Sequence, residues 1–124
     1  MTERTRQHDE FVRLSDSTLR LEVPEQDVRG LDVYDRGGER IGSVADLYVD
    51  TKERKVRFLD IRAGSFLGVG EDHFLIPVEA VASVVEDRVT IDHAREKVMG
   101  SPYLGTNGVP EYDLQRDIRE HYGY

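Results

Sequence analysis

Two sets of acidic and imidazole side chains have the types and spacing that metal binding or proton transfer would need. The run Glu-Asp-His at residues 71–73 offers oxygen and nitrogen ligands. Consecutive residues of a strand point to opposite faces of a sheet, so these three side chains do not easily converge on one ion. Asp113, Asp117 and His121 follow one another at helical spacing, and we interpret them as the solvated face of a terminal helix. The sequence therefore predicts no metal site.

A glycine-rich stretch at residues 64–70 has the composition of a phosphate-binding loop but not its context. Such a loop opens a helix whose N-terminus meets the anion, whereas here a strand follows and no Lys-Ser or Lys-Thr pair ends the stretch. We interpret the stretch either as a wide connection between strands or as a loop tip. In the second case it would present Phe66, Leu67 and Val69 as an interaction anchor.

Nucleophilic catalysis would need a nucleophile, a base and an orienting group in one cleft. The chain contains four histidines and several serines, but no serine stands in a Gly-x-Ser-x-Gly motif. A small coiled barrel of this length also leaves little room for a pocket. We therefore expect no catalytic residue, no cofactor and no enzymatic activity. A deep pocket lined by His73 or His93 would instead favour an enzyme or a ligand-binding domain.

The composition fits one acidic domain of 124 residues. Acidic residues number 25 and basic residues 17, and the resulting net charge of −8 is spread along the chain. This charge disfavours general binding to the phosphate backbone of nucleic acids. The chain contains no cysteine, no apolar run long enough to span a membrane and no secretory signal in its polar N-terminus. We expect a cytoplasmic protein.

The elements that position these side chains are organised around a hairpin at residues 30–50. Gly37 and Gly38 supply its turn, because glycine adopts positive φ without steric cost. The apolar phase of the second hairpin strand changes near Gly42, which indicates a β-bulge there and makes this glycine costly to replace. Asp50 begins the turn that follows.

The next strand changes its apolar phase between Phe58 and Leu59. Regular alternation would place Val56 and Phe58 on one face, and Leu59 and Ile61 on the other. A sheet with one solvated face does not accept this pattern, whereas a strongly coiled sheet or a sheet packed on both faces does. Pro77 ends the strand after it.

About six short strands with turn signals between them predict a small antiparallel barrel or coiled sheet. A short helix, a linker and a C-terminal helix follow. The apolar edge of this last helix is formed by Tyr112, Leu114, Ile118 and Tyr122.

Eight short segments resemble the PRC-barrel family in their order and spacing, over about residues 28–103. They are DVYD at 32–35, GGERIGSV at 37–44, DLYVD at 46–50, KVRFL at 55–59, FLG at 66–68, FLIP at 74–77, VTI at 89–91 and PY at 102–103. The family includes the cytoplasmic domain of the photosynthetic reaction centre H subunit and the C-terminal domain of a ribosome maturation factor. In both settings the barrel acts as an adaptor between macromolecules.

The resemblance implies a mainly β PRC-barrel and a mode of action without a reaction. We expect an N-terminal arm at residues 1–27, the barrel at 28–103 and a linker with a helical extension at 104–124. We expect a bacterial, non-enzymatic adaptor or scaffold that binds an unidentified protein partner. Its expected structural residues are Gly37, Gly38, Gly42, Asp50 and Pro77.

A second hypothesis is an RNA-processing or ribosome-associated factor, by analogy with the maturation factor. Arg54, Lys55, Arg57 and Arg62 form a local basic cluster, but acidic residues lie among them. This interruption disfavours RNA unless the fold gathers the basic side chains.

We also predict a homodimer. The third strand is apolar on both faces, the glycine-rich loop carries unshielded apolar side chains, and the C-terminal helix needs a surface on which to dock. The helix could dock on its own barrel or on that of a partner copy. The residues expected at the interaction surface are Phe58, Phe66, Leu67, Val69, Tyr112, Leu114, Ile118 and Tyr122.

Overall fold

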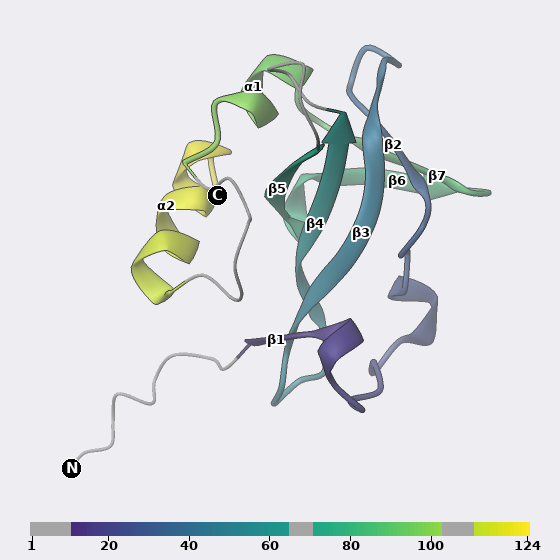
Figure 1. The fold of residues 1–124 in the computed structure, drawn as a ribbon, viewed down its shortest axis with the longest axis vertical. Coiled ribbons are helices and arrows are strands. Elements are labelled where there is room, and N and C mark those ends of the chain that lie inside the picture. The colour runs from purple at the N-terminus through teal and green to yellow at the C-terminus, as the bar shows by residue number, and fades with distance from the viewer. Residues whose placement is uncertain (1–10, 65–70, 103–110) are drawn as a thin grey trace.

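A computed structural model describes residues 11–64, 71–102 and 111–124 of the chain (Figure 1). Within these residues, seven strands form one sheet, and two α-helices follow it. The strands are β1 (Phe11–Arg13), β2 (Asp32–Tyr34), β3 (Arg40–Asp50), β4 (Val56–Gly64), β5 (Glu71–Pro77), β6 (Val81–Val85) and β7 (Arg88–Ile91). The helices are α1 (Arg95–Met99) and α2 (Tyr112–His121), and three short 3-10 turns are η2 (Leu14–Asp16), η3 (Pro24–Gln26) and η4 (Val78–Ala80).

The strands follow the order β5-β4-β3-β2-β7-β6, and β1 pairs with β3. The sheet curls into a half-barrel, so the mainly β fold predicted from the sequence is confirmed (Figure 1). One pair departs from the expected antiparallel arrangement, because β2 and β7 run parallel with Val33 opposite Val89. The β6–β7 hairpin reaches β2 only after the chain has crossed from β5 through η4, and this crossover reverses its direction.

The central strand β3 pairs with β2 along its first half, with β1 along its last residues and with β4 on its other edge. Its register with β2 shifts beside Gly42, which pairs with Val33, while Tyr34 pairs with Arg40. A Cβ atom at Gly42 would lie 2.2 Å from the carbonyl oxygen of Arg62 in β4. Glycine at this position therefore allows two backbones to approach more closely than any side chain would permit.

Strand β4 is buried on both faces within a single chain. Val56, Phe58, Leu59 and Ile61 are each at most 4% exposed. The expectation that one of its apolar sets requires a second copy is therefore wrong. The expectation that Val56 lies on the same face of β4 as Phe58 is also wrong. Because the register with β3 shifts between Tyr48 and Val49, a bulge forms at residue 57. Val56 therefore lines the same groove as Leu59.

The C-terminal helix packs on its own barrel. Helices α1 and α2 lie beside β5 (Figure 1), and Ile118 is fully buried there. Tyr122 is 3% exposed and contacts the rings of His93 and His121 edge-on, at 5.0 and 4.9 Å between centroids. Ile118 and Tyr122 are thus core residues and not the surface residues that we expected. Among the described residues, no helix is long and apolar enough to cross a membrane.

The β2–β3 turn is held by a buried carboxylate that the sequence analysis did not single out. Asp35 accepts hydrogen bonds from the backbone N–H groups of Glu39, Gly37 and Arg95, at 2.8, 2.9 and 3.3 Å. These bonds, led by the one from Glu39, lower the pKa of Asp35 below its usual value. Gly38 adopts φ +89°, as the turn prediction required. Asp35 therefore joins this hairpin to the start of α1.

Candidate interaction groove

A groove of about 380 Å³ lies between α2 and the face of the barrel formed by β1, β4 and η4. We call it the α2 groove. Four segments that are distant in the sequence contribute to it. The side chains that line it are Phe11, Arg57, Phe58, Glu79, Tyr112, Gln115, Arg116 and Arg119.

The floor of the α2 groove is aromatic. The rings of Phe11 and Phe58 lie 5.8 Å apart between centroids and are tilted by 50°. Phe58 is 2% exposed, so it supplies a fixed apolar base, while Tyr112 is 47% exposed at the rim. Aromatic side chains give large apolar contact at low conformational cost and are enriched at protein interfaces.

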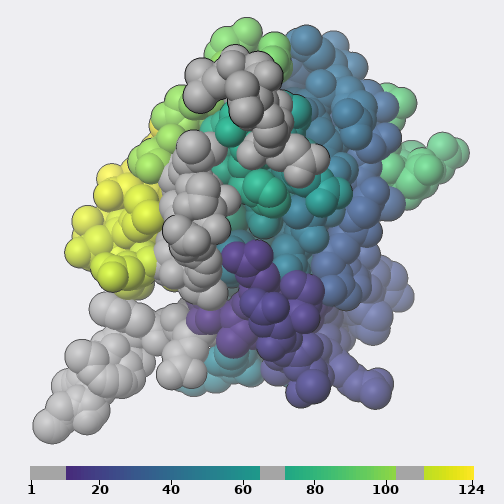
Figure 2. Space-filling model, in the orientation of Figure 1, coloured from purple at the N-terminus to yellow at the C-terminus, as the bar shows by residue number. Residues whose placement is uncertain are grey.

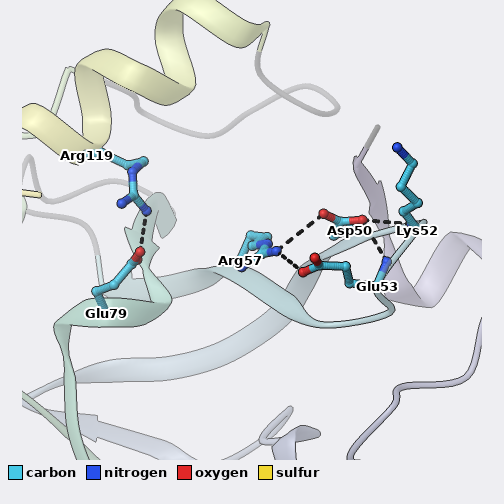
Figure 3. Close-up of polar contacts among 6 residues, drawn as sticks. All are labelled: Asp50, Lys52, Glu53, Arg57, Glu79 and Arg119. Atoms are coloured by element: carbon cyan, nitrogen blue, oxygen red, sulfur yellow. Dashed lines mark hydrogen bonds and ion pairs between the residues drawn. The ribbon is translucent and has the colours of Figure 1, made fainter. Parts of the chain in front are cut away.

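One wall of the groove is built on the buried carboxylate of Asp50. Its Oδ1 accepts hydrogen bonds from the backbone N–H groups of Lys52 and Glu53 at 2.7 and 3.0 Å, which closes the β3–β4 turn (Figure 3). The guanidinium of Arg57 lies 3.4 Å from Asp50 Oδ2 and 2.5 Å from Glu53 Oε1. A buried carboxylate is tolerated when it is fully hydrogen-bonded. Asp50 thus shapes the turn and orients Arg57 at the groove.

The opposite wall joins α2 to η4 through an ion pair. Arg119 Nη1 lies 2.5 Å from Glu79 Oε2, and the two side chains point toward each other across the groove (Figure 3). Both are more than a third exposed, so the pair is accessible to water. Arg116 lies 3.7 Å from both Asp113 and Asp117. The arginines of the groove are therefore already paired with carboxylates.

Pro77 determines where η4 begins. It is the last residue of β5, where it pairs with Phe58, and η4 follows it directly. Because η4 carries Glu79, the end of β5 places one wall of the groove next to its floor. From the sequence, Pro77 is expected only to end a strand.

The comparison with protein-family models decides which family this architecture represents. The model described as PRC-barrel domain matches residues 22–98, which is more than half of the chain. The chain belongs to the PRC-barrel domain family. A search of curated proteins found none that matches it. The match begins after β1 and ends within α1, so Phe11 and α2 contribute to the groove from outside the matched region.

The residues expected at the interaction surface of this PRC-barrel fall into three groups. Tyr112 is exposed on the α2 groove and Leu114 is partly buried against the core. Phe58, Ile118 and Tyr122 are buried, because curling of the sheet and docking of α2 cover them. The prediction for the glycine-rich loop cannot be compared with the structure, because these side chains lie outside the described residues: Phe66, Leu67 and Val69.

The residues not predicted from the sequence to line an interaction surface are Phe11, Arg57, Glu79 and most of the groove-facing side of α2. A signal for the helix part was present. Tyr112, Gln115, Arg116 and Arg119 recur at positions i, i+3, i+4 and i+7, which is the spacing of one helix face. The prediction instead followed the apolar edge of the same helix, which includes the buried residues Ile118 and Tyr122. No local signal connects Phe11 or Glu79 to this helix.

Several of the acidic and imidazole residues weighed as metal ligands have other contacts. Asp113 and Asp117 each lie 3.7 Å from Arg116, and His121 Nε2 lies 2.7 Å from the carbonyl oxygen of Lys97. His73 Nδ1 lies 2.8 Å from Asp60 Oδ1. Burial raises the pKa of Asp60, and the hydrogen bond with His73 partly offsets that rise. The neighbouring carboxylate of Asp46 accepts hydrogen bonds from Ser15. Within the described part of the chain, no group of three or more such side chains is arranged to hold a metal ion.

Proposed function

We propose that this PRC-barrel protein is a non-enzymatic adaptor that binds a partner protein in the α2 groove. The PRC-barrel is a domain of the protein-interaction type. The observation that carries the proposal is the lining of the groove, which combines an aromatic floor, the exposed Tyr112 and a rim of arginines. Tyrosine and arginine are the residues most often found at the energetic centres of protein interfaces.

The chemistry of the groove defines the partner segment that would fit. An apolar side chain would cover the rings of Phe11 and Phe58. A carboxylate beside it would replace Glu79 as the partner of Arg119. Exposed ion pairs contribute little free energy, so this exchange would cost little. We therefore expect a segment that carries an apolar anchor next to an acidic residue.

The RNA-binding alternative has less support. In the basic cluster considered above, Arg54 lies 2.5 Å from Glu22, and Arg57 is held by Asp50 and Glu53. The net charge of −8 opposes binding to a phosphate backbone. The absence of an enzymatic role is also part of the proposal. Among the described residues that line the α2 groove, there is no histidine or serine. His93 and His121 line a separate hollow of about 410 Å³, which is wide open to solvent and is not a deep pocket.

Site-specific photo-crosslinking in the source cells tests the adaptor proposal. A benzoylphenylalanine at Tyr112 should give a discrete crosslinked protein, whereas the same group at Met99, which is similarly exposed on α1, should not. The Tyr112 product should disappear when the floor or the wall is altered by Phe11→Ala or Arg119→Glu. Equal products from both positions, or a product that contains RNA, would contradict the proposal.

The homodimer stays a prediction, and fewer observations now support it. Strand β4 and helix α2 are both covered within one chain, so two of the three features that motivated the dimer have another explanation. Size exclusion coupled to light scattering at tens of micromolar tests it. A mass of one chain would exclude the dimer. A mass of two chains that survives deletion of residues 104–124 would exclude α2 from its interface.

A further inference from the structure

Strand β6 ends the sheet with an uncovered edge. Among the described residues it pairs with β7 and with no other strand. Val84 and Val85 are 47% and 61% exposed, although they are β-branched and apolar. The β6–β7 hairpin lies beyond β2 in the sheet (Figure 1), and its tip projects from the body of the molecule (Figure 2).

The backbone of β6 is available for a further strand. Only Glu86 and Asp87 separate Val85 from Arg88, and in a two-residue hairpin the residues that flank the turn exchange the ladder hydrogen bonds. The N–H and C=O of Val84 then point away from β7, toward the free edge. Proteins usually protect such an edge with a charge, a proline or a covering element. Strand β6 contains neither a charged residue nor a proline.

An apolar groove of about 180 Å³ lies beside this edge, and we call it the β6 groove. Strands β4, β6 and β7 contribute to it, so it occupies the seam that the curled sheet leaves open. It is smaller than most small-molecule pockets and suits one or two apolar side chains. Its lining residues include Val28, Val56, Leu59, Val78, Val84 and Val89.

The charges around the edge select the kind of strand that it would accept. Glu25 lines the β6 groove, and Glu86 and Asp87 form the turn of the hairpin. Among the described residues, none of these three acidic side chains makes an ion pair. A strand with Lys or Arg on both sides of an apolar segment would supply the opposite charge.

A second copy of the chain fits this edge poorly. Two β6 strands paired antiparallel about Val84 would set Glu86 opposite Ala82 and Asp87 opposite Val81. Neither turn acid would then face an opposite charge. Each copy also carries a net charge of −8, so the two would repel each other.

We infer that the β6 edge and the β6 groove accept an extended segment of a partner protein by strand addition. In this segment, apolar side chains that enter the β6 groove alternate with polar ones, and basic residues stand at both ends. Main-chain hydrogen bonds to Val84 would supply affinity, and the groove and the acidic side chains would supply specificity. The β6 groove shares no lining residue with the α2 groove, although β4 and η4 contribute to both, and the two grooves would allow the protein to hold two partners.

Peptide binding to the full chain tests this inference. The probe is a fluorescent peptide, Lys-Lys-Val-Thr-Val-Thr-Val-Lys-Lys, and the comparison peptide has Glu in place of each Lys. Fluorescence anisotropy should show roughly tenfold tighter binding of the Lys peptide, because two favourable charge pairs become two repulsive ones. Replacement of Glu25 and Asp87 by Lys should reverse this preference. Absence of binding by the Lys peptide at about 1 mM would overturn the inference.

A backbone variant separates strand addition from simple charge attraction. Val84→Pro removes the outward N–H, whereas Val84→Thr keeps it with a side chain of similar shape. Val84→Pro should lose most of the binding and Val84→Thr should retain it, with Arg119→Glu in the α2 groove having no effect. Where Val84→Pro lowers the melting temperature, N-methylation of alternate peptide residues replaces it as the test. Equal binding in the matched pair would overturn strand addition. A two-chain mass without peptide that Val84→Pro abolishes would assign the edge to a second copy instead.

Discussion

The two outermost strands of the sheet, β5 and β6, differ in how far the rest of the chain covers them. At one end, β5 pairs with β4 and has α1 and α2 packed beside it. At the other end, β6 pairs with β7 among the described residues and leaves Val84 and Val85 exposed. A free strand edge invites pairing with other chains, and proteins normally cover it. Helix α2 lies beyond the family match, so residues outside the matched domain help to cover β5.

The contrast separates residues that stabilise the fold from residues that are available for binding. Fully burying an isoleucine contributes about 2–3 kcal/mol, and Ile118 of α2 is fully buried at the closed end. Val84 and Val85 at the open end gain little of this free energy because they stay in water. A substitution at the closed end should therefore reduce stability, and one at the open end should reduce binding.

The largest effect on the free energy of unfolding is expected where β3 pairs with β4, in the middle of the sheet. Gly42→Val should destabilise the protein by about 3 kcal/mol or more, because its side chain would collide with the backbone of Arg62. Chemical denaturation measures the change. Gly64→Ala is the matched control, since a Cβ there meets nothing within 4 Å. An unchanged melting temperature of Gly42→Val would show that neither end depends on this close approach.

The closed end is tested by removing its anchor. Ile118→Ala should cost about 2–4 kcal/mol, since it leaves a cavity between α2 and the barrel. Asp117→Ala on the same helix changes an exposed side chain and should stay within about 0.5 kcal/mol. Urea denaturation of the two variants gives the difference. If both variants were equally stable, the helix would contribute nothing to closing the β5 end.

The smallest effect is a pH dependence confined to the closed end. His93 contacts the ring of Tyr122 edge-on, and its Nε2 lies 3.1 Å from the hydroxyl of Tyr124. Burial lowers the pKa of His93 below its unfolded value of 6.5. A lowered imidazole pKa means that the unfolded chain binds the proton more readily. Stability is then fully present above pH 6.5 and declines as the pH falls from there toward the folded pKa.

The loss attributable to His93 should be below about 1 kcal/mol, because the ring is only partly buried and solvent screens it. Melting temperatures between pH 8 and pH 5.5 measure it, and His93→Gln should flatten the profile in that interval. The contrary result is that the melting temperatures of the wild type and of His93→Gln decline identically as the pH falls. It would assign the decline to other titrating groups.

The sequence by itself determined the local features of the chain. Turn glycines, apolar alternation and helical spacing depend on neighbouring residues, so they predicted the hairpin around Gly38, the bulge beside Gly42 and the helix that carries Ile118. The family resemblance also came from local segments. These features were sufficient for the mainly β PRC-barrel fold.

Only the tertiary structure decided which surfaces remain free. The bulge at Arg57 placed Val56 and Leu59 in one groove, and the crossover after β5 made β7 parallel to β2. The α2 groove joins Phe11 to residues of α2 about a hundred positions later in the chain. Contacts between distant segments depend on how the whole sheet curls and closes, which no local pattern encodes. The same long-range packing buried β5 and left β6 open.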